Sequence, residues 1–494
     1  MEKISDFLIK CMLLIFMFMV SLGILVGGLG VFKERPSYLF CFILGLLAFL
    51  LLLRLAPRLR GLGAKLLGFG RLKLGLIITA ISLALGLSWI LYFQIVPSVD
   101  FLTFYESARA IAHGEAVDRI YLGLFPHILG YSSFLGWVMS IFGESVMVAA
   151  LTNLILNTVS GLCIYVLCQR HLSFGKAAFA YLLWALLPSK TMYCSMVLSE
   201  PLYTCLILLF LLCLSYAGSI KGPGWLRASL SLLFGLVSGI LLMGINVTRP
   251  VGLILAIAFA IWALLLRGKA AKTLLGWGLL GLYSIGLALG SAGFQQRWER
   301  WEYVALQELP SSLPAYNIYV GLNPDTLGSY SQEDMDLLLS YRYDPDKGSA
   351  RYAQEQMLLH VEERIKSGDI NFPKLLVTKL GKLLGSDEGA PFYGQAAMSQ
   401  FEFSFWSAIC NVFYYLLFFL CIAGTWRMFR GPDTSCICLV PLYSIGLILA
   451  HMIVEVGGRY KYSLLPMFII LASCSLDLFS KNTMPHRRTL HRKS

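Results

Sequence analysis

The sequence predicts an all-α fold, a polytopic transmembrane helical bundle of about 12 spans with interfacial helices and one small, mostly helical extracytoplasmic domain. Two properties of the composition point to this class. Of 494 residues, 57% are hydrophobic and only 14% are charged, whereas soluble domains carry about 25% charged residues. The mean hydropathy is +0.71. A third observation is that apolar runs of membrane-spanning length recur along the chain.

These runs give the predicted spans and the division of the chain. The first run, residues 8–31, is too long for a signal-peptide core and lacks a convincing cleavage site, so it is predicted to be a transmembrane helix. The predicted spans are residues 8–31, 38–53, 74–97, 146–168, 176–190, 196–216, 228–244, 250–266, 273–292, 405–425, 435–453 and 463–480. The resulting regions are 1–73 with two helices and a basic loop, 74–292 with seven helices and an outer loop at 98–145, the extracytoplasmic domain 293–404, and 405–494 with three helices and a basic tail.

Charge in the short loops predicts the orientation of the chain. The run at 125–143 is apolar but short; if it does not cross the membrane, six basic segments all lie on the cytoplasmic side. Those segments, which together hold 20 Lys or Arg and one acid, are residues 54–73, 169–176, 217–227, 267–272, 426–434 and 481–494. Because Lys and Arg concentrate in cytoplasmic loops, we expect a multi-pass cell-membrane protein with both termini in the cytoplasm and 125–143 interfacial or re-entrant. The same rule accounts for the net charge of +12, so no nucleic-acid partner is predicted.

The segment 293–404 differs from the rest of the chain, with 16 acids against 10 Lys or Arg. Ser331 and Asp334 have the spacing of a capping box, and residues 349–368 are predicted to form a helix that ends at Gly368. We therefore expect a small helical domain on the outer face.

One helix of this domain is predicted to lie along the membrane surface. Residues 372–385 place Leu on one side and Lys374, Lys379 and Lys382 near the other. Such a helix can cap an outer site or serve as a structural linker.

The twelve cysteines lie in apolar runs, and none falls within 293–404. They are predicted to be small apolar side chains and not disulfides. No cluster has metal-ligand spacing, since Cys436 and Cys438 form a pair without a second one, so neither a metal nor a cofactor is predicted.

Asp100 is the candidate catalytic residue. It follows the apolar run 74–97, at the point where that run should reach the membrane surface. A carboxylate there can act as general base on an incoming hydroxyl. The alternative is a solvated acid or a helix N-cap.

Other polar residues fall at the predicted outer ends of spans, while the interiors of five predicted spans carry no charge. These candidate substrate-binding residues are Lys190, Glu200, Arg249, Glu455, Arg459 and Tyr460. Arg offers a bidentate fork to a lipid phosphate and Lys a compact charge. The alternative for each cation is snorkelling to lipid headgroups.

The arrangement resembles the GT-C superfamily of polytopic glycosyltransferases, in particular its protein O-mannosyltransferase-like members. The resemblance covers roughly residues 74–480 and is carried by the phrases PSVDFLTFYESARAI, FPHILGYSSFLGWVMSIFGES, LSEPLY, VTRP and RYKYSLLP. That family has a seven-helix module with a catalytic Asp in its first outer loop and a larger outer loop after the seventh helix. This chain has a single Asp where some relatives have a paired acid, and it lacks the large sugar-recognition domains.

The resemblance implies transfer of a sugar, a hexose such as mannose, from a polyprenyl-phosphate carrier to a glycan, lipid or protein acceptor of the cell envelope. Asp100 would deprotonate the acceptor in one inverting displacement, while Arg249, Arg459 and Lys190 hold the carrier phosphate. His127 and Tyr105 are close enough in sequence to line the site, although His127 can be structural and Tyr105 a belt aromatic. Protein cations can replace a metal in such a reaction.

Two other classes of protein share parts of this pattern. A transporter or lipid flippase has a similar number of spans, but ionisable groups near the bilayer midplane or broken helices are expected there. A polysaccharide polymerase or ligase acting on diphosphate-linked carriers shares the large outer loop. An assay with a labelled polyprenyl-phosphate sugar separates the three, because only the glycosyltransferase releases the bare carrier phosphate.

Overall fold

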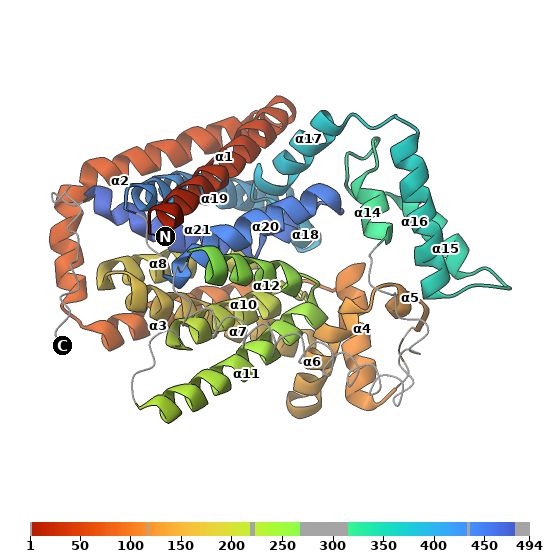
Figure 1. Ribbon diagram of the computed structural model, residues 1–494, viewed down its shortest axis with the longest axis horizontal. Helices are drawn as coiled ribbons and strands as arrows, with labels where there is room; N and C mark the ends of the chain where they lie inside the picture. The colour runs from red at the N-terminus through yellow and green to blue at the C-terminus, as the bar shows by residue number, and fades with distance from the viewer. Residues whose placement is uncertain are drawn as a thin grey trace.

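The protein is a bundle of helices. The computed structural model describes residues 2–115, 117, 119–217, 223–266, 315–431 and 435–479. Every regular element in these ranges is helical. Figure 1 shows long helices running side by side, with a group of shorter helices at one end. The predicted class, an all-α polytopic helical bundle, is confirmed.

Seven segments are long and apolar enough to cross a membrane. They lie in α1 (Glu2–Glu34), α2 (Ser37–Leu67), α3 (Arg71–Tyr92), α7 (Val146–His171), α10 (Glu200–Ala217), α19 (Gln400–Arg430) and α20 (Leu439–Ile453). Each corresponds to a predicted span. The predicted loop at 54–73 is wrong in part, because α2 continues through it to Leu67. Leu, Ala, Arg and Lys dominate that stretch and favour a helix beyond the membrane surface.

Of four other predicted spans, three are divided or shorter than expected in the described chain, whereas 228–244 is covered in full by a longer helix. Residues 176–190 correspond to α8 (Phe174–Leu186) followed by α9 (Pro188–Tyr193). Residues 228–244 lie within α11 (Gly224–Thr248). Residues 250–266 correspond to α12 (Gly252–Ile261) with a π-helical end at Trp262–Leu266. The run 463–480 is α21 (Leu464–Ser473), followed by a 3-10 segment at Cys474–Phe479. Since a spanning helix needs about 20 residues, α8 and α21 are too short to cross alone.

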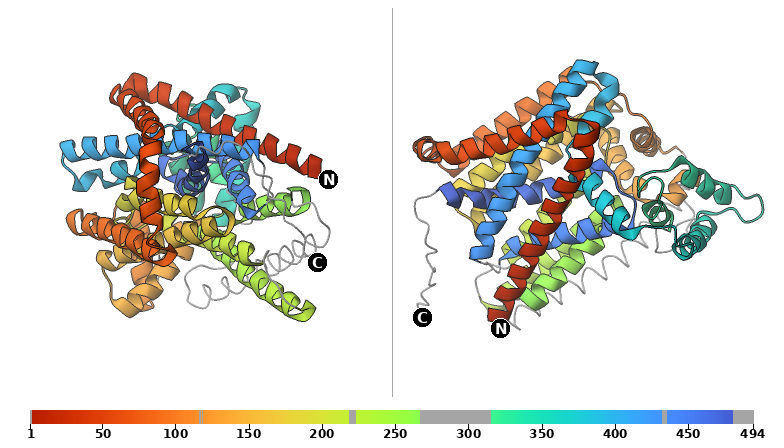
Figure 2. Two further views of the ribbon diagram at one scale, coloured as in Figure 1. Left: turned by 90° about the vertical axis from the view of Figure 1, so that its left-hand side faces the viewer. Right: turned by 90° about the horizontal axis from the view of Figure 1, so that it is seen from above.

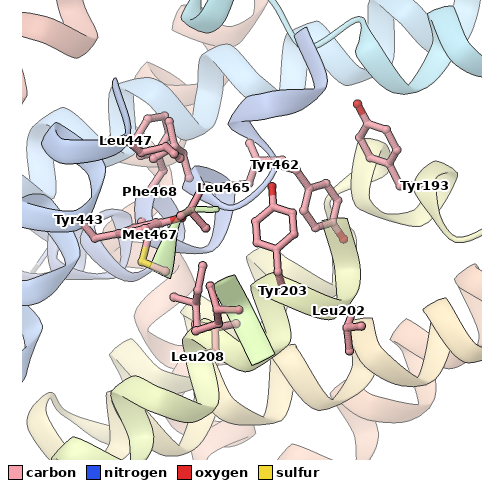
Figure 3. Packing of buried hydrophobic residues seen from close by; sticks show 14 of the residues in the cluster. Tyr193, Leu202, Tyr203, Leu208, Tyr443, Leu447, Tyr462, Leu465, Met467 and Phe468 are labelled. Carbon is pink, nitrogen blue, oxygen red and sulfur yellow. The ribbon is translucent and has the colours of Figure 1, made fainter. Parts of the chain in front are cut away.

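The position of α21 explains why its sequence is so apolar. All of its residues are buried, and it packs against α19 and α8. Figure 3 shows Leu465, Met467 and Phe468 of α21 in the core together with Tyr443 and Leu447 of α20. A helix buried on all sides has the same composition as one facing lipid. The predicted span 273–292 lies outside the described residues.

Three helices follow α3 at one end of the bundle: α4 (Asp100–His113), α5 (Arg119–Leu124) and α6 (His127–Phe142). The apolar run at 125–143 is α6. It packs closely on α4 and α11, since a Cβ at Gly136 would lie 2.7 Å from Ala108 O and one at Gly130 would lie 2.2 Å from Val247 O. Its interfacial or re-entrant placement stays a prediction.

The helical character of the polar domain is confirmed in its described part, residues 315–404. Its helices are α14 (Ala315–Gly321), α15 (Gln332–Arg342), α16 (Ala350–Lys366), α17 (Phe372–Leu384) and α18 (Gly389–Gly394). Ser331 caps α15 by accepting a hydrogen bond from the Asp334 amide, as predicted. Helix α16 ends just before Gly368, whose φ of +79° suits glycine. The views in Figures 1 and 2 place α14 to α16 at the same end of the molecule as α4 and α5.

The predicted lysine face of α17 is wrong at Lys379. Leu375, Leu380 and Leu383 are buried as expected, and Lys374 and Lys382 are exposed. Lys379 is also fully buried. Its ammonium donates hydrogen bonds to Gly321 O at 2.7 Å and Val454 O at 2.8 Å, which offset the cost of burial.

Glycine pairs bring α17 against the first membrane helix. Gly27 of α1 faces Gly381 of α17 and its C-cap residue Gly385, and Gly23 faces Leu380 and Leu384. Both pairs have the G-x-x-x-G spacing that lets two helix backbones approach closely. A Cβ at Gly27 would lie 2.4 Å from Gly381 O. Helix α1 therefore holds α17 close to the bundle.

We predict that Gly27→Val separates α1 from α17. The clash with the α17 backbone cannot be relieved by a side-chain rotation, so the loss of stability should be about 1–3 kcal/mol, as in other overpacked interiors. Thermal unfolding in detergent measures it. Gly30→Val is the matched control, because a Cβ there meets nothing within 4 Å. Equal losses in both variants would contradict the close packing.

The predicted orientation can be tested at exposed positions. With an outward-facing domain, Ser340→Cys in α15 should react with a membrane-impermeant thiol reagent in intact cells. Lys65→Cys, on the basic part of α2, should react only after permeabilisation; both side chains are exposed. The native cysteines, ten of which are buried, give the background in the unmodified protein. The reverse labelling pattern would overturn the orientation.

Candidate active site

The segment after α20 carries the centre of the candidate site. It includes a short 3-10 helix, η5 (Gly458–Lys461). The Arg459 guanidinium donates a hydrogen bond from Nη2 to Asp100 Oδ2 at 2.5 Å, and its Nε lies 3.7 Å from Glu200 Oε1. Residues far apart in sequence therefore meet at the ends of α4, α10 and α20.

A second arginine shares the same carboxylate. Arg249, the C-cap of α11, places Nη2 at 3.7 Å from Glu200 Oε1 and its guanidinium 4.9 Å from the Tyr460 ring centre. The Glu200 side chain is 1% exposed. It occupies the first turn of α10, where the helix dipole favours a negative charge. Glu200 thus links two buried guanidinium groups.

Glu455 adds a third carboxylate, held by the neighbouring tyrosine. Tyr460 donates a hydrogen bond from its hydroxyl to Glu455 Oε1 at 3.3 Å. Burial raises the pKa of Glu455 above its ordinary value, while Arg459 opposes the shift. His451 stacks on Tyr460 with ring centres 5.1 Å apart, and its Nδ1 lies 3.0 Å from Glu455 O. The loop geometry around Glu455 is therefore fixed from two sides.

Aromatic rings surround Arg459. Its guanidinium carbon lies 5.5 Å from the centre of the Phe101 ring, 5.3 Å from that of Tyr393 and 5.7 Å from that of Tyr460. Such faces attract cations and hold the guanidinium plane in place. Phe101 and Tyr393 were not predicted, since the sequence offers no signal beyond the position of Phe101 next to Asp100.

Asp100 is the exposed member of this cluster. Its side chain is 42% exposed, against 10% for Arg459. The N-cap of α4 is Val99, and Asp100 is the first helical residue. Asp100 is therefore not the N-cap, and its partly solvated carboxylate is paired with Arg459.

The backbone before Asp100 is strained. Val99 has φ +49° and ψ −125°, a conformation that a β-branched residue adopts only at a cost of about 1–3 kcal/mol. Strain of this kind persists where the surroundings hold the chain in place. Here it immediately precedes Asp100, whose carboxylate contacts Arg459.

Two buried atoms of the site form an ion pair but make no hydrogen bond. Within the described residues, Glu200 Oε1 and Arg459 Nε make no hydrogen bond, and they face each other at 3.7 Å. A buried polar atom without a hydrogen bond costs about 1–3 kcal/mol, so such atoms at a cluster of charges are candidates for ligand binding.

His127 lies beside this cluster, in line with its predicted position. Burial lowers the pKa of His127 to about 3, and the positive charge of Arg249 contributes further. Its imidazole is therefore neutral at physiological pH and can accept or donate a hydrogen bond without adding charge.

Two predicted residues are not brought to the cluster. Tyr105 is five residues after Asp100, which on a helix turns it about 140° away, toward Glu106, Arg109 and Glu144. Lys190 is fully buried in α9, where its ammonium donates to Ser82 Oγ at 3.3 Å and Ala185 O at 3.5 Å. The turn between α8 and α9 directs Lys190 inward, toward α3.

The fold and the site define an all-α polytopic membrane protein with an arginine and carboxylate cluster at one end of its bundle. No protein-family model and no curated protein sequence matches the chain. Similar solved structures exist.

One is the archaeal oligosaccharyltransferase AglB from Archaeoglobus fulgidus in complex with an inhibitory peptide and a dolichol-phosphate, at a TM-score of 0.44 and 14% identity, covering 82% of this chain and 50% of AglB. The Archaeoglobus fulgidus oligosaccharyltransferase tethered with an acceptor peptide gives a TM-score of 0.47 and 12% identity, covering 82% and 49%. ArnT from Cupriavidus metallidurans bound to undecaprenyl phosphate gives a TM-score of 0.34 and 12% identity, and the match covers 80% of this chain and 77% of ArnT.

The chain thus spans about half the length of the archaeal chains that it matches. At these TM-scores the matches define neither a sugar, an acceptor nor a catalytic residue.

Proposed function

We propose that the chain is an integral membrane glycosyltransferase that moves a sugar from a polyprenyl-phosphate carrier to an acceptor hydroxyl at the outer face of the membrane. The observation that carries this proposal is the cluster of two buried arginines beside one exposed carboxylate, Asp100. The arginines suit a phosphate, and Asp100 suits a hydroxyl.

Phosphate binding requires an exchange of partners. Arg249 and Arg459 already face the carboxylates of Asp100, Glu200 and Glu455, so an added phosphate must replace one of these anions. Asp100 is the partner that can leave, because it is 42% exposed whereas Glu200 is 1% exposed. The phosphate then accepts hydrogen bonds from Nη2 of Arg459 and from its Nε, which makes no hydrogen bond in the described structure.

The exchange frees Asp100 for chemistry. The acceptor hydroxyl oxygen attacks the anomeric carbon while its proton passes to the Asp100 carboxylate. The bond from the anomeric carbon to the phosphate oxygen breaks, and its electron pair stays on the carrier phosphate. Arg249 and Arg459 stabilise that charge, so the step needs no metal ion. A single displacement of this kind inverts the anomeric centre.

The finer assignment rests on the family resemblance. It gives a hexose such as mannose as the sugar and a glycan, lipid or protein as the acceptor. AglB and ArnT are described with dolichol-phosphate and undecaprenyl phosphate, the carrier class proposed for this chain. Incubation of membranes with labelled polyprenyl-phosphate sugars, followed by detection of the bare carrier phosphate, tests the reaction and its sugar. No release from any such donor would reject the proposal.

Asp100→Asn should abolish transfer without weakening carrier binding. Loss of a general base costs on the order of 100- to 10,000-fold in rate. Binding of polyprenyl phosphate should be at least as tight as in the unmodified protein, because Asn no longer competes as an anion for Arg459. Single-turnover transfer and equilibrium binding measure the two effects.

The matched control for Asp100→Asn is Glu106→Gln, which removes an acid from the same helix. Glu106 pairs with Arg109 and is 45% exposed. It should change neither rate nor affinity. Full turnover in Asp100→Asn would remove Asp100 from the chemistry.

Arg249→Ala and Arg459→Ala should each weaken carrier binding. Each loses a charge-assisted hydrogen bond to the phosphate, worth roughly 1.5–3 kcal/mol, or about 10- to 150-fold in affinity. Arg58→Ala removes an exposed arginine of the basic segment and should leave the affinity unchanged. Equal binding by all three variants would refute the phosphate site.

A further inference from the structure

The segment Val454–Lys461 has no long helix of its own to hold it, yet it carries Glu455, Arg459 and Tyr460. It lies between the end of α20 and the start of α21. A guanidinium that must meet both Asp100 and a phosphate needs this backbone to be fixed, because a displacement of about 1 Å can cost 100-fold in rate. The contacts of the segment show how it is fixed.

A buried lysine holds its first residue. Lys379 of α17 is 0% exposed and donates from Nζ to Val454 O at 2.8 Å and to Gly321 O at 2.7 Å. The same stretch is tied to the polar domain by Glu455 N donating to Asn317 O and Val456 N donating to Gly328 O, both at 2.9 Å. Helix α17 is itself packed against α1. The start of the segment is therefore attached to α14 and α17.

A second buried lysine holds its last residue. Lys461 donates from Nζ to Ser386 O, and its Nζ lies 3.8 Å from Asp387 Oδ1 and 4.9 Å from the centre of the Tyr414 ring. The side chains of Lys461 and Asp387 are 3% and 1% exposed. Asp387 is fastened in turn, because its amide donates to Asn411 Oδ1 at 2.8 Å. The end of the segment is therefore attached to α19.

The core behind Lys461 keeps this end rigid. Tyr462 follows it directly and packs with its ring centre 5.2 Å from that of Tyr193. Figure 3 shows Tyr462 beside Tyr203 in the buried core. On the other side, a Cβ at Gly389 would lie 3.5 Å from Arg459 N, so the start of α18 touches the backbone of η5.

We propose that Lys379 and Lys461 are positioning residues that clamp the two ends of the segment Val454–Lys461 and so orient Arg459 toward the carrier phosphate. The phosphate in this inference rests on the proposed function. The clamp itself rests on the contacts alone. Neither lysine is a phosphate ligand itself. Both ammonium groups are buried and bonded to main-chain carbonyls, unlike the Nε of Arg459.

The clamp is tested first without any ligand. In the full-length protein in detergent, Lys379→Met should increase amide hydrogen exchange in residues 454–461 by at least 10-fold, while exchange in α19 stays unchanged. Lys374→Met is the matched control, since it makes the same substitution at an exposed position of the same helix. Lys461→Met should have the same effect as Lys379→Met, and Lys461→Arg should restore part of the protection. Equal exchange in Lys379→Met and Lys374→Met, or a uniform increase throughout the bundle, would overturn the clamp.

A double-mutant cycle then separates positioning from direct binding. Lys461→Met should weaken polyprenyl-phosphate binding by about 10-fold when Arg459 is present. This is the lower end of the loss in affinity expected when one charge-assisted hydrogen bond is lost. In the Arg459→Ala background it should weaken binding less than 2-fold, because the lysine acts through the arginine. Additive effects in the two backgrounds would make Lys461 a phosphate ligand and overturn the inference. If the unmodified protein binds no polyprenyl phosphate, the proposed function fails while the exchange result still decides the clamp.

Discussion

The pairing of Arg459 is the interaction on which the architecture of the site depends. A guanidinium that is 10% exposed at the edge of an apolar bundle must be matched by anions, because an unpaired buried charge costs several kcal/mol. Asp100 and Glu200 supply them from α4 and α10. The ends of helices far apart in the chain are therefore drawn to one point.

The carboxylates of Glu200 and Asp100 have different roles in the cluster. Glu200 is inaccessible and contacts both arginines, so it keeps the two guanidinium groups near each other whatever else binds. Asp100 faces outward from a strained turn at Val99. A cluster built in this way can exchange one anion for another without losing its buried framework. That property is what a site for an anionic leaving group requires.

Packing outside the cluster supports this arrangement. The glycine pairs of α1 and α17 bring the polar domain against the bundle, and α17 then provides the lysine that holds Val454. The membrane helices and the polar domain therefore act as one support for the loop that carries Arg459. Buried lysines in such places bond to carbonyl groups of the main chain, so a cation near a lipid surface need not bind lipid.

The sequence by itself determined the class of the fold, the helical polar domain and the cap at Ser331. It also singled out residues that the structure brings into one cluster: Asp100, Glu200, Arg249, Glu455, Arg459 and Tyr460. Hydropathy, charge bias and capping patterns are local, so they can be read along the chain. The sequence could not separate α21, buried on all sides, from a lipid-facing helix, because protein core and lipid select the same residues.

Only the tertiary structure decided which cations lie at the cluster. Lys190 was predicted at an outer span end like Arg459 and Lys379 on a surface helix, yet the ammonium groups of both are buried against other parts of the protein. Tyr105 is excluded by the turn of a helix, and Tyr393 is added by α18, far along the chain. The physical reason is that contact between distant residues depends on how helices pack, and packing is not encoded at any single position.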